Sequence, residues 1–131
     1  MIVVDTSVWI DYFNDIATQE VEILDRLLGI EPILIGDLIL VEVLQGFRTE
    51  TDFRRARRLL DTLDFSPMIG RRVALASAHN FRTLRTAGIT VRKAIDVIIG
   101  TFCSLHNYRL LHRDRDFDPM EIHCGLSVLR T

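Results

Sequence analysis

The sequence of 131 residues predicts a single α/β domain, in which a central, mostly parallel sheet carries helices on both faces. Short apolar segments alternate with segments of helical periodicity along the whole chain. The 48% hydrophobic and 26% charged content is that of an ordinary globular domain with a substantial core. No repeat, low-complexity tract or linker divides residues 1–131, so we expect one domain.

The first third of the chain is expected to contain two strands and three helices. Short apolar runs predict the strands at residues 2–5 and 32–35. Apolar residues at intervals of three and four predict helices from about residue 7 to 13, over 20–29 and over 37–45. Gly29 marks the end of the second helix, and Asp37 is expected to cap the third.

The rest of the chain continues the alternation. The tetrapeptide Thr49-Glu50-Thr51-Asp52 matches a capping box and opens an arginine-rich helix that extends to about Leu63. Further helices are expected over 71–87, before Gly88, and over 93–106. Short strands are expected at 65–67, 109–111 and 127–129, and the proline in the first of these predicts an edge strand.

Composition excludes several classes of protein. No apolar run approaches the roughly 20 residues that span a bilayer, and the N-terminus lacks the basic region of a signal peptide. We therefore expect a cytoplasmic protein without membrane segments. Two cysteines are too few for a disulfide framework, so both are expected to be reduced, with Cys103 in a helix core. The net charge of −2 gives no global indication of nucleic-acid binding, although arginines are concentrated in the middle and late parts of the chain.

Four acidic residues stand in strongly apolar surroundings, where an unpaired carboxylate is rarely buried. They are Asp5, Glu42, Asp96 and Asp114, and Asp116 follows closely. A divalent metal ion is the simplest positive partner for such a set. Asp5 and Asp114 also lie at or just beyond the carboxyl end of a predicted strand, and ligands of open parallel sheets bind at that edge. Each acid taken singly is equally compatible with a structural ion pair, and the residues alone do not show that the acids converge.

Other acids and other catalytic chemistries carry less weight. Asp11, Asp15 and Asp37 are expected to be solvated or capping acids. The histidines lack the spacing of a zinc site, the glycines are isolated rather than grouped in a phosphate loop, and no serine has a Ser–His–Asp context. No acid stands two positions after Asp5, which disfavours a haloacid-dehalogenase-type phosphatase.

Four segments in chain order resemble the PIN-domain family, and the length is similar to that of VapC-type toxins. The segments are Val4–Ile10, Val41–Gly46, Ala94–Gly100 and Leu110–Phe117, each carrying one of the acids. The resemblance implies a PIN-like fold and a Mg²⁺- or Mn²⁺-dependent endoribonuclease, the toxin of a VapBC toxin–antitoxin pair. It also implies an RNA substrate, inhibition by a cognate VapB-like antitoxin, and a homodimer.

The resemblance also implies a role for individual residues. Asp5, Glu42, Asp96 and Asp114 would be catalytic metal ligands, and Asp116 would add a direct or water-mediated contact. Thr6 and Ser7 would support the site through hydroxyl hydrogen bonds. Arg113 and Arg115 flank the acids, and from this position in the sequence we expect them to contact substrate. His112 stands where the family often has Thr or Ser; it either contacts substrate or metal or covers the strand end, and we favour the second.

Several alternatives remain open at this stage. The same acids would serve a DNA-directed or structure-specific nuclease, and a non-catalytic binding module could share the fold. The arginines of residues 54–58 are either a solvated helix face or the border of an RNA path. The aromatic residues Trp9, Tyr12 and Phe13 are expected to pack a core or dimer face, with a groove for an antitoxin helix as the alternative.

Overall fold

The computed structural model describes residues 1–130 and contains one parallel sheet of five strands in the order β3-β2-β1-β4-β5. The strands are β1 (Ile2–Val4), β2 (Ile33–Gly36), β3 (Asp64–Ser66), β4 (Arg109–Leu111) and β5 (Ser127–Val128). Every neighbouring pair is parallel. The α/β class with a parallel sheet flanked by helices is therefore confirmed.

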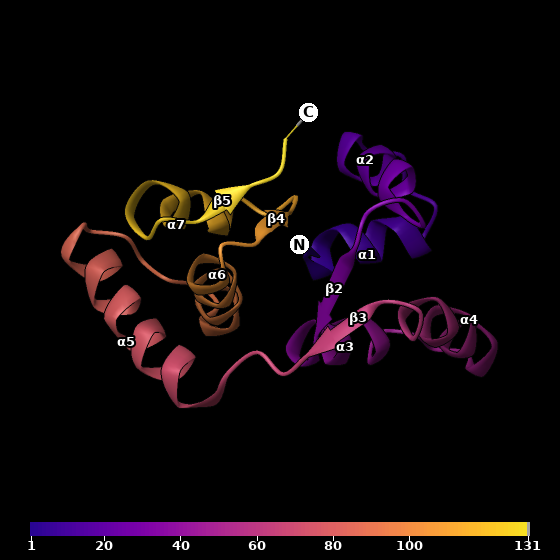
Figure 1. The fold of residues 1–131 in the computed structure, drawn as a ribbon, viewed down its shortest axis with the longest axis horizontal. Helices are drawn as coiled ribbons and strands as arrows, with labels where there is room; N and C mark the ends of the chain where they lie inside the picture. The colour runs from indigo at the N-terminus through magenta and orange to yellow at the C-terminus, as the bar shows by residue number, and fades with distance from the viewer. Residues whose placement is uncertain (131) are drawn as a thin grey trace.

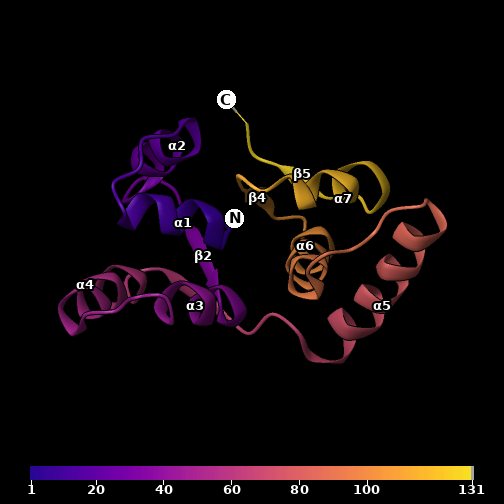
Figure 2. The same ribbon diagram turned by 180° about the vertical axis from the view of Figure 1, so that it is seen from behind.

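The helices divide into two groups around this sheet. They are α1 (Thr6–Phe13), α2 (Gln19–Leu27), α3 (Asp37–Leu44), α4 (Glu50–Leu60), α5 (Gly70–Thr86), α6 (Ala94–His106) and α7 (Asp118–His123), with a 3₁₀ turn η1 (Arg115–Phe117). In Figures 1 and 2, α1 to α4 lie on one side of the molecule and α5 to α7 on the other. The segment after β3 crosses between the two groups (Figure 1). None of the helices in the described chain is both long and apolar enough to span a bilayer.

The central strands are apolar on both faces, as a parallel sheet covered by helices requires. All residues of β1 and β2 are buried. The helices on either side contribute the largest fully buried side chains of the core, among them Trp9 and Phe102. Cys103 is buried within α6, and neither cysteine is in a disulfide, as expected.

The order of the strands determines where a ligand can bind. From β1 the chain adds β2 and β3 on one side, and it then returns to add β4 and β5 on the other. The strand order therefore reverses between β1 and β4, and such a reversal marks the crevice at the carboxyl ends of the strands in which open parallel sheets bind ligands. Val4 pairs with Leu111 at these ends, and the Asp5 N–H donates to the Leu111 carbonyl at 2.9 Å.

Helix starts follow the sequence expectations with one exception. Thr49 accepts a hydrogen bond from the Asp52 N–H at 3.2 Å and caps α4, as the capping-box pattern predicts. The prediction that Asp37 caps α3 is wrong, because Gly36 is the N-cap and Asp37 is the first helical residue. The Asp37 carboxylate instead accepts from the Met68 N–H at 3.0 Å, and so ties α3 to the segment after β3.

Two further departures concern the middle and the C-terminal part of the chain. The turn η1 and the six-residue helix α7 were not expected, because they are too short to produce a readable periodicity. The strand expected at 65–67 occupies Asp64–Ser66, since Pro67 has no N–H with which to extend the ladder.

Candidate active site

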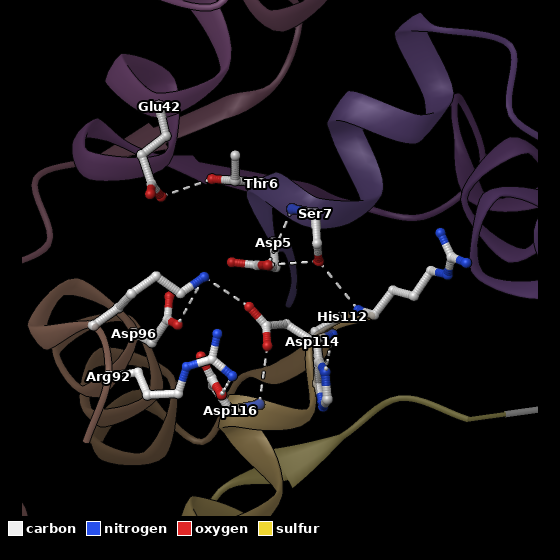
Figure 3. A network of polar contacts seen from close by, with 11 residues as sticks. Asp5, Thr6, Ser7, Glu42, Arg92, Asp96, His112, Asp114 and Asp116 are labelled. Carbon is white, nitrogen blue, oxygen red and sulfur yellow. Dashed lines mark hydrogen bonds and ion pairs between the residues drawn. The ribbon is translucent and has the colours of Figure 1, made fainter. Parts of the chain in front are cut away.

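The site begins at the carboxyl end of β1, where Asp5 both caps α1 and points into the crevice (Figure 3). Asp5 is 3% exposed. Its Oδ2 accepts from the Ser7 N–H at 3.0 Å and from Ser7 Oγ at 2.6 Å. The Ser7 hydroxyl in turn accepts from the Arg113 N–H at 3.1 Å, so it joins the ends of β1 and β4. Burial raises the pKa of Asp5, and the hydrogen bonds from Ser7 oppose this rise.

Glu42 enters the site from α3. The Thr6 hydroxyl donates to its Oε1 at 2.8 Å, which links α3 to the first residue of α1. Partial burial raises the pKa of Glu42, the hydrogen bond from Thr6 lowers it, and the charge of Asp5 raises it further. In the view of Figure 3, Asp5 lies between Glu42 and the remaining three acids.

Asp96 lies in the first turn of α6 and is 5% exposed. Its Oδ2 is buried and accepts no hydrogen bond from residues 1–130, although Lys93 Nζ forms an ion pair with it at 3.3 Å. Burial, and next the charge of Asp5, raise the pKa of Asp96 to about 6, with Lys93 partly offsetting both. The carboxylate is therefore short of hydrogen-bond donors and positive charge.

Asp114 and Asp116 complete the site beyond β4. Asp114 Oδ1 accepts from the Asp116 N–H at 2.9 Å and caps η1, and its Oδ2 accepts from Lys93 Nζ at 2.8 Å. Partial burial raises the pKa of Asp114, but the bond from Lys93 and that from the Asp116 N–H outweigh it, so the pKa is lowered. Ligand oxygens of Asp96, Asp114 and Asp116 all lie within 4.8 Å of one another.

The donor set fits a hard divalent cation. Every candidate ligand atom is a carboxylate oxygen, which is the donor that Mg²⁺ and Mn²⁺ prefer. The buried Asp96 Oδ2 accepts no hydrogen bond within residues 1–130, and burial raises the pKa values of Asp5, Glu42 and Asp96, with the charge of Asp5 adding to the rise at Glu42 and Asp96. A divalent ion on these oxygens would relieve the repulsion.

His112 supports Asp114 from behind. Its Nδ1 accepts from the Asp114 N–H at 3.2 Å, and its ring packs on Phe117 with 4.9 Å between the centroids. A neutral ring that accepts at Nδ1 carries its proton on Nε2, and that atom is buried and has no partner among residues 1–130. This geometry favours the expected role of covering the strand end.

Two of the remaining sequence expectations, those for Arg113 and Asp11, change in the structure. The Arg113 guanidinium is bound to Asp11 at 2.8 Å. Asp11 is only 9% exposed, so the expectation that it is solvated is wrong: it holds Arg113 on α1. Trp9 is fully buried and forms no part of a surface groove. Arg115 is exposed and has no partner among the described residues, which leaves it free for an external anion.

Sequence reasoning missed two cations of the site. Lys93 contacts both Asp96 and Asp114, and Arg92 lies 3.8 Å from Asp116 Oδ1. The spacing between Lys93 and Asp96, three residues at a helix start, is the signal that would have indicated the first pair. Both cations come from the loop that precedes α6.

Comparison with known proteins adds to this geometry. A family model described as PIN domain matches residues 2–122. Ribonuclease VapC11 of Mycobacterium tuberculosis and VapC ribonuclease Mb1587 of Mycobacterium bovis are each 37% identical over 126 residues, which cover 90% of this chain and 90% of the relative.

Solved structures share the fold at lower sequence identity. A chain of VapBC2 from Rickettsia felis, bound to a DNA fragment from its promoter, matches with a TM-score of 0.78 and 15% identity, over 98% of each chain. FitAcB from Neisseria gonorrhoeae matches with a TM-score of 0.75 and 17% identity, over 99% of this chain and 97% of that one. A chain of a toxin–antitoxin complex from Klebsiella pneumoniae matches with a TM-score of 0.69 and 24% identity, over 89% of this chain and 90% of that one.

Proposed function

The chain belongs to the PIN-domain family, and we propose on this premise that it is a metal-dependent endoribonuclease of the VapC type, the toxin of a toxin–antitoxin pair. Relatives named VapC ribonuclease, at 37% identity over nearly the whole chain, support the reaction class. The observation that carries the proposal is the convergence of Asp5 and Asp114, which follow β1 and β4, with Glu42 of α3 and Asp96 of α6 (Figure 3).

In the proposed reaction, water hydrolyses an RNA phosphodiester. The water oxygen forms a bond to phosphorus, and the bond from phosphorus to the departing ribose oxygen breaks. One proton stays on the new P–OH group, and the other passes through solvent to the departing oxygen. A bound Mg²⁺ or Mn²⁺ would polarise the water and neutralise charge on the phosphate. Asp5, Glu42 and Asp96 would hold the ion, with Asp114 and Asp116 beside them.

The remaining residues of the site would orient these ligands and the RNA. The hydroxyls of Ser7 and Thr6 fix the rotamers of Asp5 and Glu42 through direct hydrogen bonds. Arg115 is exposed within the turn that follows Asp114, and its guanidinium is suited to an RNA phosphate. Arg113 is less suited to that role, because its guanidinium is already paired with Asp11.

We further propose that an antitoxin segment binds a groove formed by α1, α2 and α4. Two adjoining cavities of about 510 and 800 Å³ share Tyr12, Asp25 and Leu59 in their lining. The groove is lined by both apolar and charged side chains, such as Ile16 and Arg55 in the first cavity. An amphipathic helix laid in a groove is a common mode of peptide recognition. The homodimer also remains a proposal.

Substitution of the central acids tests the proposed activity. Asp5→Asn and Asp96→Asn remove one ligand charge each at nearly constant volume, so RNA cleavage should fall by about 100-fold or more. Cleavage of a fluorescent RNA, with circular dichroism to verify folding, provides the measurement. Asp15→Asn, which alters an exposed acid outside the site, serves as the control and should retain activity. Full activity in both folded site variants would refute the proposal.

Metal removal and a matched substrate pair separate the alternatives. EDTA should stop cleavage, and either Mg²⁺ or Mn²⁺ in excess should restore it. The wild-type protein is also assayed on an RNA and a DNA of identical sequence. Preferential cleavage of DNA would favour the alternative of a DNA-directed nuclease. Binding of RNA without any cleavage in saturating metal would favour a non-catalytic module.

A further inference from the structure

Lys93 is chemically exceptional in this chain. The protein has 16 basic residues, and Lys93 is the only lysine among them. All the other basic positions, including the neighbouring Arg92, carry a guanidinium. A lysine ammonium is a compact point charge with three rotatable donors, whereas a guanidinium is a planar fork. The single lysine ammonium lies between two carboxylates, those of Asp96 and Asp114.

The five acids of the site divide into two sets around Asp96. Asp5 and Glu42 are held by hydroxyl groups, and neither forms an ion pair within residues 1–130. Asp114 and Asp116, by contrast, have Lys93 at 2.8 Å and Arg92 at 3.8 Å. Asp96 belongs to both sets, because Lys93 contacts its Oδ2 while the charge of Asp5 acts on it from the other side.

Two-metal nucleases hold one ion on each side of a shared carboxylate. Here the oxygens of Asp96, Asp114 and Asp116 lie close enough together to bind an ion. Lys93 Nζ already lies among them, at 2.8 Å from Asp114 Oδ2 and 3.3 Å from Asp96 Oδ2. A cation bound through the same two oxygens would have to displace the ammonium.

We propose that Lys93 is a positioning residue that takes the place of a second metal ion, so that this protein binds a single divalent ion on the side of Asp5, Glu42 and Asp96. The inference rests on the proposed function. The ammonium holds Asp96 and Asp114 together and supplies, on the side away from the metal, a positive charge that balances the developing charge of the phosphate. Arg92 supports the role of Lys93, because its guanidinium neutralises the neighbouring Asp116.

The charges of the site agree with one divalent ion. Five carboxylates face two resident cations, Lys93 and Arg92, which leaves a formal excess of three negative charges. The excess falls on the side without ion pairs, where the partners of Asp5 and Glu42 among residues 1–130 are the uncharged hydroxyls of Ser7 and Thr6 and the Ser7 N–H. The side of Asp5 and Glu42 therefore needs a bound cation, whereas Asp114 and Asp116 already have Lys93 and Arg92.

The number of Mn²⁺ ions bound provides the test. Mn²⁺ binding to wild type, Lys93→Ala and Lys93→Met is measured from the loss of the free-ion electron paramagnetic resonance signal, with folding verified by circular dichroism. Wild type should bind one ion, and both variants should bind two, because the oxygens of Asp96 and Asp114 that Lys93 contacts become available. Arg115→Ala, which removes one charge from the same edge without touching a carboxylate, should still bind one.

Each outcome has a distinct meaning. Two ions in the wild type would refute the role of Lys93 while leaving a metal-dependent nuclease intact. One ion in the wild type and one in both folded lysine variants would refute it equally. No ion in the wild type at millimolar Mn²⁺ would instead overturn the metal dependence of the proposed function itself.

The single lysine also permits a direct observation of the ammonium. Protein labelled with ¹³C-lysine gives one side-chain Cε signal, which belongs to Lys93. Saturating Mg²⁺ should leave this signal at its metal-free position, and Mn²⁺ should broaden it strongly because the ion binds nearby. A shift to the position of a free lysine on adding Mg²⁺ would show that the metal displaces the ammonium, and would contradict the proposal.

Discussion

Asp96 has an unfavourable position in the metal-free protein. It is nearly fully buried, it lies beside the charge of Asp5, and its pKa is raised to about 6 from an ordinary 3.8. The folded protein therefore takes up a proton at this group more readily than the unfolded chain does. At neutral pH the charged Asp96 destabilises the fold, and a bound cation or a proton removes that cost.

This position predicts how stability depends on pH. As pH falls from about 7 to about 4.5, Asp96 is protonated in the folded state first, so its contribution to the free energy of unfolding should rise by on the order of 1 kcal/mol. Thermal unfolding in EDTA across this range, for wild type and Asp96→Asn, provides the measurement. Asp96→Asn should have the higher Tm at pH 7 and a smaller gain on acidification. A lower Tm for Asp96→Asn at pH 7 would contradict the prediction.

The start of α3 depends on close packing at the end of β2. A Cβ at Gly36 would lie 2.1 Å from Met68 Sδ, and Met68 is fully buried. Gly36 is therefore required here for space, since its φ of −89° is open to any residue. Because α3 begins at the next residue and carries Glu42, a displaced helix start would also move a proposed metal ligand.

A substitution at Gly36 tests this dependence. Gly36→Ala should destabilise the fold by about 1–3 kcal/mol through overpacking, and it should weaken metal binding as Glu42 moves. Gly46→Ala, whose added Cβ would make only an ordinary contact at 3.6 Å, is the matched control. Adding Met68→Ala to Gly36→Ala should restore part of the metal affinity. Chemical denaturation and metal titration of the variants measure both effects, and unchanged metal affinity in Gly36→Ala would refute the link.

Helical periodicity was sufficient to predict the longer helices, because their apolar faces repeat over several turns, and short apolar runs were sufficient to predict the strands. The short elements η1 and α7 carry no such repeat, and they depend on contacts such as the buried Met120 against α6. The Asp37 cap was predicted from residue type alone, yet the strand ends one residue later than expected and shifts the cap to Gly36.

The candidate site was predictable as a list of acids but not as an arrangement. Asp5, Glu42 and Asp96 are distant in sequence, so only the strand order brings them to one crevice. The partners of these acids were hidden for the same reason. Pairs such as Arg113 with Asp11, 102 residues apart, leave no local signal. Lys93 was within reach of sequence reasoning, since it is three residues from Asp96.

The two proposed binding sites are lined by different residues. The acidic crevice lies where β1 and β4 end, whereas the groove of α1, α2 and α4 is lined by apolar and charged side chains and includes none of the five acids. Helix α1 connects them, because its first residues hold Asp5 and Glu42 while Tyr12 and Phe13 at its end line the groove. An antitoxin held in the groove would therefore be anchored one short helix away from the metal site.

This separation predicts that antitoxin binding and RNA cleavage can be altered independently. Ile16 lines the groove and is 45% exposed, so Ile16→Asp places a charge in the proposed contact without opening the core. Affinity for the cognate antitoxin should fall by about 10-fold or more, while cleavage by the free protein should be unchanged. Isothermal titration with the antitoxin, and cleavage with and without it, measure the two effects.

Ile122→Asp is the matched control for this experiment, because Ile122 is 76% exposed and lies on α7, outside the groove. It should bind antitoxin as the wild type does. If the antitoxin is anchored in the groove, another part of it must extend to the crevice to inhibit cleavage. A peptide limited to the groove-binding segment should therefore bind without inhibiting cleavage, whereas the full antitoxin should bind and inhibit. If Ile16→Asp binds the full antitoxin with wild-type affinity, the groove is not the docking site, and the inhibitor must bind at the acidic crevice itself.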